Sequence, residues 1–261
     1  MGKQFKLRTG ARGVEWTDKT CNVISGCMHE CRWQMPNGDV AVCYAETLAE
    51  TGSRKPVYPH GFQHHYFHPS RIADLRSGSI PELIFVDSMS DMFASNVPDV
   101  QIRMMCDEMR KSPQHAYQSL TKAAPRLLKF LDDIPPNLWV GVSSPPDWFL
   151  KRHLTHDAQR RMLAKSLKVL HQVKATTGNI VWMSAEPISW DLTPVITENH
   201  PLDWIVIGAA SSGRKYFQPN PEYVKSLLEV MDATQTAVFY KGNIRAMFQA
   251  NDLGTPALNR W

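Results

Sequence analysis

The sequence predicts an α/β protein, built as a partial or complete β/α (TIM-like) barrel of about six to seven parallel strands with outer helices. Short apolar runs rich in β-branched and aromatic residues recur along the chain, and such runs are typical of strands buried on both faces. Segments with helical periodicity separate them. Because parallel strands need crossover connections, this alternation favours a parallel sheet covered by helices.

The predicted strands start near the N-terminus, with GVEWTDKTCNVIS at 13–25. Six later runs continue the sheet: LIFVDSM at 83–89, AYQSLTK at 116–122, LWVGVSS at 138–144, IVWMSAE at 180–186, WIVIGAA at 204–210 and TAVFYKG at 236–242. The predicted helices span 97–112, 124–133, 157–178 and 220–233, some opened by Pro or Asp and one closed by Gly. At 261 residues we expect one domain over 1–261.

The composition is that of a soluble protein, with 43% hydrophobic and 21% charged residues. No apolar run approaches the roughly 18 residues that a membrane span needs. The basic N-terminal stretch MGKQFKLRTGARG lacks the apolar segment of a secretory signal, so we expect a cytoplasmic protein. A net charge of +4 permits phosphate contacts but is smaller than that of a dedicated nucleic-acid binder.

Three of the five cysteines lie in GCMHECRWQMPNGDVAVCYAE at 26–46. In a cytoplasmic protein such a group indicates metal ligation or catalysis rather than disulfides. Cys27, Cys31 and Cys43 could bind zinc if His29 supplied a fourth ligand. Three thiolates without a fourth instead suit a four-iron cluster with one iron open to an external ligand. The two other cysteines, at positions 21 and 106, are expected to pack in the core.

Polar residues follow most of the predicted strands, where loops build the active sites of such folds. Because the strands are parallel, these residues are expected to converge on one face. They are Ser88, Ser90, Asp91, Thr121, Lys122, Ser143, Ser144, Glu186, Ser211, Ser212, Lys241 and Asn243.

The cysteine segment resembles the GCxHxCxYCYA loop of the spore photoproduct lyase-like branch of the radical S-adenosylmethionine (SAM) superfamily. Here GCMHEC and CYAE are separated by an insertion, QMPNGDVAV, so the cysteine spacing is three and then eleven residues instead of three and then two.

Nearly the whole chain is similar to a phage and bacterial family of radical SAM-like proteins. The matching pieces include VEWTDKTCNVISGC, HPSRI, IFVDSMSDMF, PQHAYQSLTKAAPRLL, LWVGVS, MSAEP, DWIVIGAASSG and FYKGN. One departure stands out, because GAASSG replaces the family's usual GGESG and so lacks its acidic residue.

The resemblance implies that Cys27, Cys31 and Cys43 bind a [4Fe-4S] cluster and that the chain binds and cleaves SAM. Further residues are implied as cofactor contacts: Tyr44, Ser88, Ser90, Asp91, Lys122 (to the SAM carboxylate), Ser143 and Glu186 (to the ribose). Ordinary structural roles remain open for several of them, namely core packing for Tyr44, a helix cap for Asp91 and a salt bridge for Lys122. Lys241 and Asn243 are candidate substrate contacts.

The expected substrate is a nucleic acid, with a modified thymine in phage DNA as the leading hypothesis and flavodoxin or ferredoxin as electron donor. If phage-encoded, the protein would act in the bacterial host cytoplasm. Segment 47–70 is the candidate lid, and its HGFQHHYFH stretch is expected to cover the site rather than bind metal. Trp16, Trp182 and Trp190 are expected to be buried, with base stacking as the alternative.

Two other functions remain open. The first is a radical SAM enzyme acting on a free nucleotide or small metabolite. The second is a zinc-stabilised, noncatalytic nucleic-acid-binding protein.

Overall fold

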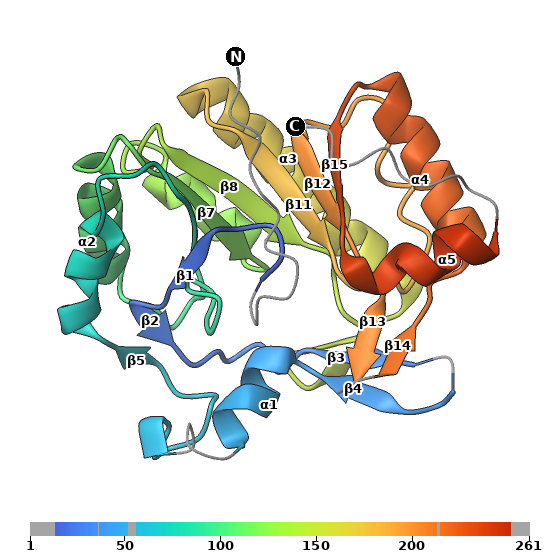
Figure 1. Cartoon of the computed structure of the whole chain (residues 1–261), viewed down its shortest axis with the longest axis horizontal. Coiled ribbons are helices and arrows are strands. Elements are labelled where there is room, and N and C mark those ends of the chain that lie inside the picture. Colours follow the sequence, from blue (N-terminus) through green and yellow to red (C-terminus); the bar gives the residue numbers. More distant parts are fainter. Residues whose placement is uncertain (1–13, 36, 52–55, 213–214, 252–261) are drawn as a thin grey trace.

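The centre of the molecule is a seven-stranded sheet (Figure 1). The computed structural model describes residues 14–35, 37–51, 56–212 and 215–251, so the whole basic N-terminal stretch, residues 1–13, lies outside the described residues. The strands pair in sequence order, every neighbouring pair being parallel. They are β1 (Lys19–Cys21), β6 (Leu83–Val86), β7 (Ala116–Thr121), β8 (Leu138–Ser143), β11 (Val181–Ala185), β12 (Trp204–Ile207) and β15 (Ala237–Tyr240). The predicted partial β/α barrel is therefore confirmed, as a curled half-barrel.

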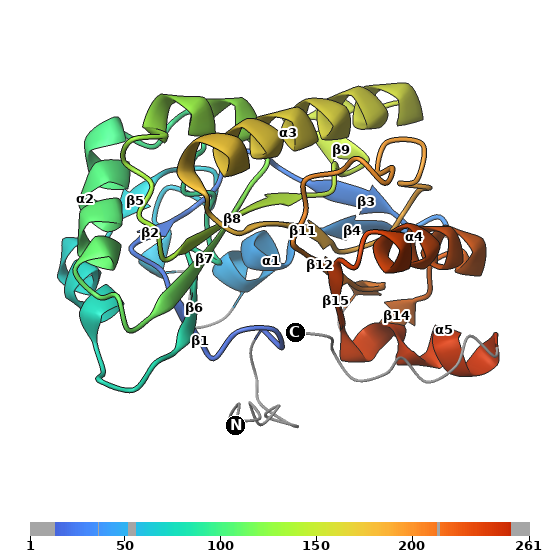
Figure 2. The same ribbon diagram turned by 90° about the horizontal axis from the view of Figure 1, so that it is seen from above.

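Helices cover the convex face of this sheet (Figure 2). They are η2 (Pro69–Arg76), α2 (Asp99–Arg110), η3 (Ala124–Phe130), α3 (His156–Thr177) and α4 (Pro221–Ala233), followed near the C-terminus by η4 (Gly242–Ile244) and α5 (Arg245–Ala250). Local signals explain their ends: the Thr155 hydroxyl accepts a hydrogen bond from the Ala158 N–H at the start of α3, and Gly178 closes it in a left-handed conformation. The segment predicted as a helix at 124–133 is instead a shorter 3₁₀ helix.

The sheet is buried on both faces. Side chains such as Ile84, Val140 and Val181 pack outward against the helices. The inner face carries a separate cluster of Trp16, Phe85, Trp182, Trp204, Val206 and Phe239. An added Cβ at Gly141 would lie 2.5 Å from the Trp182 ring, which explains the glycine in this strand. The expected burial of the three tryptophans is confirmed, with exposures of 4% for Trp16, 0% for Trp182 and 2% for Trp190.

Three small antiparallel sheets adjoin the C-terminal edge of the main sheet (Figure 1). The largest has the order β10-β9-β3-β4 and joins β10 (Arg152–His153), β9 (Trp148–Phe149), β3 (Arg32–Gln34) and β4 (Val40–Val42). The others pair β2 (Ile24–Ser25) with β5 (Tyr66–Phe67), and β13 (Ala210–Ser212) with β14 (Lys215–Phe217). The first predicted strand, 13–25, is thus two strands, because the chain leaves the main sheet after Cys21.

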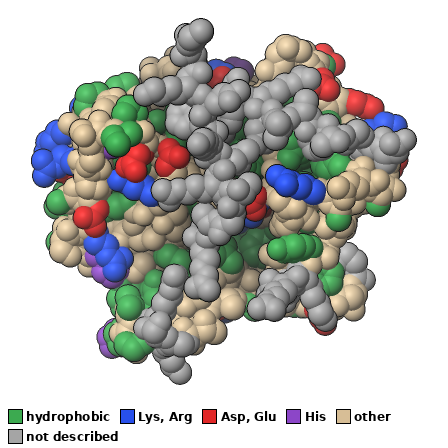
Figure 3. All heavy atoms as spheres, in the orientation of Figure 1, with side chains coloured by type: hydrophobic (Ala, Val, Ile, Leu, Met, Phe, Trp, Pro, Cys, Tyr) green, Lys and Arg blue, Asp and Glu red, His purple; other side chains and the backbone are tan. Residues whose placement is uncertain are grey.

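The described part of the surface in Figure 3 mixes Lys, Arg, Asp and Glu side chains and shows no continuous basic face. No described helix is long and apolar enough to span a membrane.

Candidate cysteine site at the mouth of the half-barrel

The loops that follow the main strands meet at one end of the sheet, which we call the mouth. The insertion between Cys31 and Cys43 forms a hairpin there, β3 and β4, in which Arg32 pairs with Val42 and Gln34 with Val40. Cys31 and Cys43 immediately flank these strands, and the Cys43 N–H donates to the Cys31 carbonyl at 3.2 Å. The eleven-residue spacing therefore keeps the two cysteines side by side, because an antiparallel pair returns to its starting point.

Cys27, the first of the three cysteines, is held by contacts with a different segment of the chain. The Cys27 N–H donates to the Phe62 carbonyl at 2.8 Å, and the Cys27 and Cys43 side chains pack against one small apolar cluster that contains Phe62. Gly26 precedes it with φ 84°, and an added Cβ there would lie 1.8 Å from the His64 carbonyl oxygen. Glycine is required at this position for both reasons.

A buried ion pair ties the hairpin to helix α1 (Tyr44–Glu50). The Arg32 guanidinium donates two hydrogen bonds to Glu46, at 2.7 and 2.8 Å, and a third to the Cys31 carbonyl at 2.9 Å. Gln63 also donates to Glu46, which is only 5% exposed. Bidentate geometry of this kind holds both partners in one orientation, so the Arg32–Glu46 pair fixes the cysteine-bearing ends of the hairpin.

The three thiols share one electrostatic environment with Lys122. Burial raises the pKa of Cys27 well above its usual value, with Asp91 and the two other thiols adding to the shift. Burial likewise raises the pKa of Cys31 to about 11, although Lys122 opposes it. Burial alone would lower the pKa of Lys122, but Cys31, Cys43, Asp91 and Cys27 outweigh it and raise the pKa. The lysine thus stays charged beside all three thiols.

Asp91, at the turn after β6, organises the middle of the mouth. Its Oδ2 accepts hydrogen bonds from the Lys122 N–H at 2.8 Å and the Thr121 hydroxyl at 3.1 Å, and its Oδ1 accepts one from the Phe93 N–H at 3.0 Å. His29 Nδ1 lies 3.4 Å from the same carboxylate. Burial lowers the pKa of His29 although Asp91 opposes the shift. The aspartate therefore caps its own turn and also positions Lys122; it does not cap the helix that follows, because α2 begins at Asp99 with Pro98 as its N-cap.

The rest of the SMSD segment at 88–91 joins the cysteine loop to α1. The Ser90 hydroxyl donates to the Gly26 carbonyl at 3.0 Å, and the Ser88 hydroxyl donates to Asn22 at 3.1 Å. Tyr44 is 53% exposed, yet its hydroxyl reaches inward and donates to the Ser88 carbonyl at 2.5 Å. Asn22 was not singled out from the sequence, since a lone Asn after a strand carries no distinctive pattern.

Glu186 and Lys241 form the opposite side of the mouth. The Glu186 carboxylate accepts hydrogen bonds from Trp16 Nε1 at 3.1 Å and from Lys241 Nζ at 3.0 Å. Asn243 exchanges two hydrogen bonds with the backbone of Ala209, at 2.8 and 3.1 Å. These pairs bring the ends of β11, β12 and β15 together, so Glu186, Lys241 and Asn243 already have structural partners.

Ser143 lies between the two sides, at the end of β8, where it is paired in register with Ser184 of β11. It is partly exposed. Whether Ser143 and the other mouth residues contact a cofactor stays a prediction.

The donor set fits a three-thiolate cluster. Cys27, Cys31 and Cys43 supply three thiols, and the Nδ1 of the candidate fourth ligand, His29, faces Asp91 instead. Within the described residues, no three His, Cys, Asp or Glu side chains are grouped as ligands of a single metal ion. In an iron–sulfur cluster each cysteine binds a different iron, so its ligands need not converge on one point. Cys21 and Cys106 are buried in the main core, as expected.

The candidate lid at 47–70 is more structured than a loop. Residues 52–55 lie outside the described residues, but the remainder includes most of α1, strand β5 and the buried side chains of Tyr58 and Phe62. Its histidines have local partners: His68 with Ser25 at 2.8 Å and His65 with Gln101 at 2.7 Å. Closure of this segment over the mouth stays a prediction.

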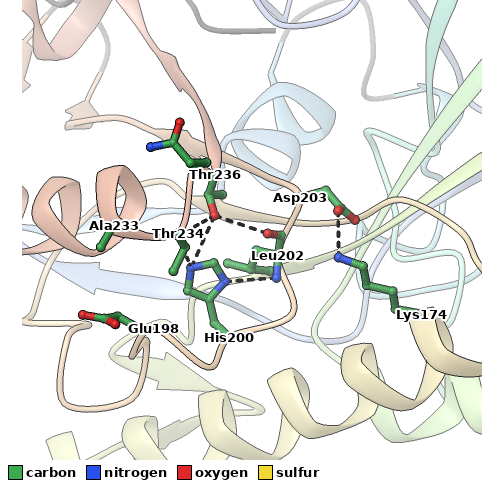
Figure 4. A pocket seen from close by; sticks show the side chains of 9 residues that line it. Lys174, Glu198, His200, Leu202, Asp203, Ala233, Thr234 and Thr236 are labelled. Carbon is green, nitrogen blue, oxygen red and sulfur yellow. Dashed lines mark hydrogen bonds and ion pairs between the residues drawn. The ribbon is translucent and has the colours of Figure 1, made fainter.

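A pocket of about 420 Å³ lies at the opposite end of the sheet, beside the starts of β12 and β15 (Figure 4). Its polar groups bond to one another. His200 Nε2 lies 3.2 Å from the Thr234 hydroxyl, and the ring's Nδ1 accepts the Leu202 N–H at 3.1 Å. Lys174 donates to Asp203 at 2.7 Å. We call this region the base, and its internal pairing indicates a structural role.

Comparison with known families decides the classification. The family model described as a protein of unknown function, DUF5131, matches residues 11–250. The chain belongs to the DUF5131 family. No curated protein sequence matches it.

Solved structures similar to this DUF5131 protein include forms of spore photoproduct lyase. A cysteine-to-serine mutant of that enzyme has a TM-score of 0.53 at 10% identity, over 92% of this chain and 79% of the other. The enzyme complexed with dinucleoside spore photoproduct gives 0.47 at 11% identity, over 91% and 79%. At such low identity the first likeness shows a shared fold alone, which agrees with the partial β/α barrel described above.

Proposed function

We propose that this protein is a radical SAM enzyme that acts on a nucleic acid, with a modified thymine in DNA as the leading substrate. The observation that carries the proposal is that Cys27, Cys31 and Cys43 meet at the mouth: the Cys43 N–H donates to the Cys31 carbonyl, and the Cys27 and Cys43 side chains pack against one apolar cluster. The cysteines hold a [4Fe-4S] cluster. Such a cluster would supply the electron for reductive cleavage of SAM, and the two together would supply the radical chemistry that removes a hydrogen atom from the substrate.

In this proposal the residues of the chain bind SAM, orient it and shield the cysteine site from water. Lys122 provides a positive charge that attracts the SAM carboxylate, since its ammonium group forms no hydrogen bond with any described residue and lies 6.0 Å from the Trp33 ring. Asp91 acts through the Lys122 backbone and holds that lysine in position. Ser88, Ser90 and Ser143 offer hydroxyl groups at the same edge of the sheet.

Tyr44 and Glu186 are the proposed contacts to the adenosine part of SAM. Burial of the Tyr44 hydroxyl, together with the charges of Cys43 and Glu186, raises the pKa of Tyr44 above its usual value. The phenol keeps its single hydrogen, which it donates to the Ser88 carbonyl, so its oxygen can act toward SAM as a hydrogen-bond acceptor.

The small sheet β10-β9-β3-β4 shields Cys31 from bulk water. Cys31 is only 5% exposed, and its neighbours Arg32 and Trp33 belong to this sheet. A radical requires such exclusion because water and oxygen would consume it.

Anaerobic reconstitution with iron and sulfide, followed by electron paramagnetic resonance of the reduced protein, tests the proposal. We expect a four-iron signal that changes when SAM is added. Cys31→Ala should lose it, whereas the matched variant Cys106→Ala, which changes a buried core thiol, should retain it. Bound zinc with no cluster and no SAM affinity would instead identify a noncatalytic binding protein.

A further inference from the structure

The hairpin of β9 and β10 has an unusual turn at the edge of the mouth. Phe149 pairs with Arg152 and Trp148 with His153, so Leu150 and Lys151 form a two-residue turn. Both turn residues have positive φ, 51° and 65°. This turn type normally takes Asn-Gly or Asp-Gly, because side chains with a Cβ are disfavoured there. A leucine and a lysine at these positions lower the stability of the turn, and folding alone does not explain why they are there.

The residues of this turn are exposed and mostly basic. The Lys151 side chain is 82% exposed, and its ion pair with Glu30 is long, at 3.6 Å. Arg152 is also exposed, and its side chain forms no hydrogen bond or ion pair with a described residue. Leu150 is 42% exposed at the apex. The turn therefore presents two cations beside one apolar side chain.

The hairpin is rigidly attached to the cysteine loop. The Leu150 N–H donates to the His29 carbonyl at 2.8 Å, and the rings of His29 and Phe149 are 4.8 Å apart. His29 lies between Cys27 and Cys31 in the sequence. Trp148 pairs with Arg32 of β3, which extends the same small sheet. A polymer with one unit in the mouth would thus have neighbouring units close to Leu150, Lys151 and Arg152.

From this geometry we infer that the Leu150–Arg152 segment binds the strand that carries the substrate base. Lys151 and Arg152 contact phosphates, and Leu150 packs against a base or sugar next to the reacting one. Nucleic acid matches this surface because it alternates negative charges with flat apolar groups, and proteins pair Lys or Arg with apolar side chains to bind it. The inference rests on the proposed nucleic-acid substrate and names the surface that would hold it.

Fluorescence anisotropy with a short labelled single-stranded DNA, over a range of salt concentrations, tests the inference. The variant carries Lys151→Ala and Arg152→Ala. The matched control carries Lys165→Ala and Lys168→Ala, which remove two equally charged, exposed side chains from the outer helix α3. We expect the first variant to bind about 10- to 100-fold more weakly near 0.1 M salt, with a salt slope shallower by about 1.4. The control should match the wild type.

A third variant separates charge from apolar contact. Leu150→Ser should weaken DNA binding without changing the salt slope, because it removes no charge. Equal weakening by both double variants, or by neither, would overturn the inference while leaving the DNA substrate in place. Polyglutamate bound with the same dependence on Lys151 and Arg152 would also overturn it, in favour of an acidic protein partner.

Failure of the proposed function has a different signature. The wild type could hold a SAM-responsive cluster but bind free nucleotides and no DNA. That result would exclude both the inferred surface and the nucleic-acid substrate, and it would support the enzyme class. If the wild type binds DNA through the hairpin but takes up no cluster, the result supports the proposed DNA-binding surface and excludes the proposed radical chemistry.

Discussion

The two ends of the half-barrel differ in how their polar side chains are paired. At the base, Lys174, Asp203 and His200 bond to one another or to nearby backbone (Figure 4). At the mouth, the Lys122 ammonium has no such partner among the described residues, and two neighbouring cysteines, Cys27 and Cys31, have raised pKa values. The mouth therefore leaves one ammonium group to bind a ligand, whereas the polar groups at the base mostly bind one another.

The largest expected effect concerns Asp91, the best-satisfied polar group of the mouth. Asp91→Ala leaves the Lys122 N–H, the Thr121 hydroxyl and the Phe93 N–H without their acceptor. We expect a loss of about 3–5 kcal/mol in the free energy of unfolding, measured by urea denaturation. Asp132→Ala, at an exposed position, should change it by less than about 0.5 kcal/mol. A loss below about 1 kcal/mol for Asp91→Ala would show that the mouth does not depend on this carboxylate.

The second largest effect expected is a pH dependence of the free energy of unfolding, which arises at Asp87. Burial raises the pKa of Asp87 to about 8, although hydrogen bonds from Ile24 and Val23 oppose the shift. Between about pH 4 and pH 8 the folded protein holds a proton that the unfolded chain releases. The stability from this group is thus fully present below pH 4 and is lost as the pH rises to about 8.

Asp87→Asn tests that dependence, because the amide is neutral at every pH and keeps an oxygen for the Ile24 N–H. Thermal unfolding between pH 5 and pH 8 should show a decline in stability of the wild type that is smaller in the variant. Parallel pH profiles would mean that Asp87 is ionised in the folded protein.

A matched pair of lysine variants compares the two ends directly. Lys174→Met should cost about 1 kcal/mol, because its half-exposed pair with Asp203 is lost, and should leave SAM affinity unchanged. Lys122→Met should cost less or even stabilise the protein, and should weaken SAM binding at least about 10-fold. Calorimetric unfolding and equilibrium SAM binding measure both quantities. The same pattern in both variants would remove the distinction between mouth and base.

The smallest effect is expected at the β9–β10 turn. Replacing Leu150 by Asn and Lys151 by Gly gives the sequence that its backbone favours, and should raise the free energy of unfolding by about 1 kcal/mol. DNA affinity should fall in the same protein. A gain in stability with unchanged DNA affinity would indicate that the Leu-Lys turn has no binding role.

The main sheet could be predicted from the sequence because each of its strands is a distinct apolar run. For example, the run at 180–186 contains β11, and that at 236–242 contains β15. Cys27, Cys31 and Cys43 could also be predicted as candidate ligands, because their segment resembles a known cysteine loop. The small sheets were not, because strands of two or three residues such as β9 and β3 are too short to show alternation.

The sequence also could not show which polar side chains pair with one another. Arg32 and Glu46 are fourteen positions apart on different elements, and no local pattern marks them as a pair. Asp91 could be placed at the mouth, but its bonds to Lys122 and Thr121 depend on how β6 and β7 lie side by side. Such contacts are set by tertiary packing, which spacing along the chain does not encode.

The hairpin between Cys31 and Cys43 also makes the length of the intervening segment adjustable. Its far end is a turn at Gly38, whose φ is 90° and where an added Cβ would meet no described atom within 4 Å. An antiparallel pair lengthened by one residue on each strand keeps its flanking residues opposite each other. Relatives could therefore carry longer or shorter hairpins without separating the cysteines, and a search that demands one fixed spacing would miss them. The same turn is a natural place to graft an affinity tag or a fluorophore.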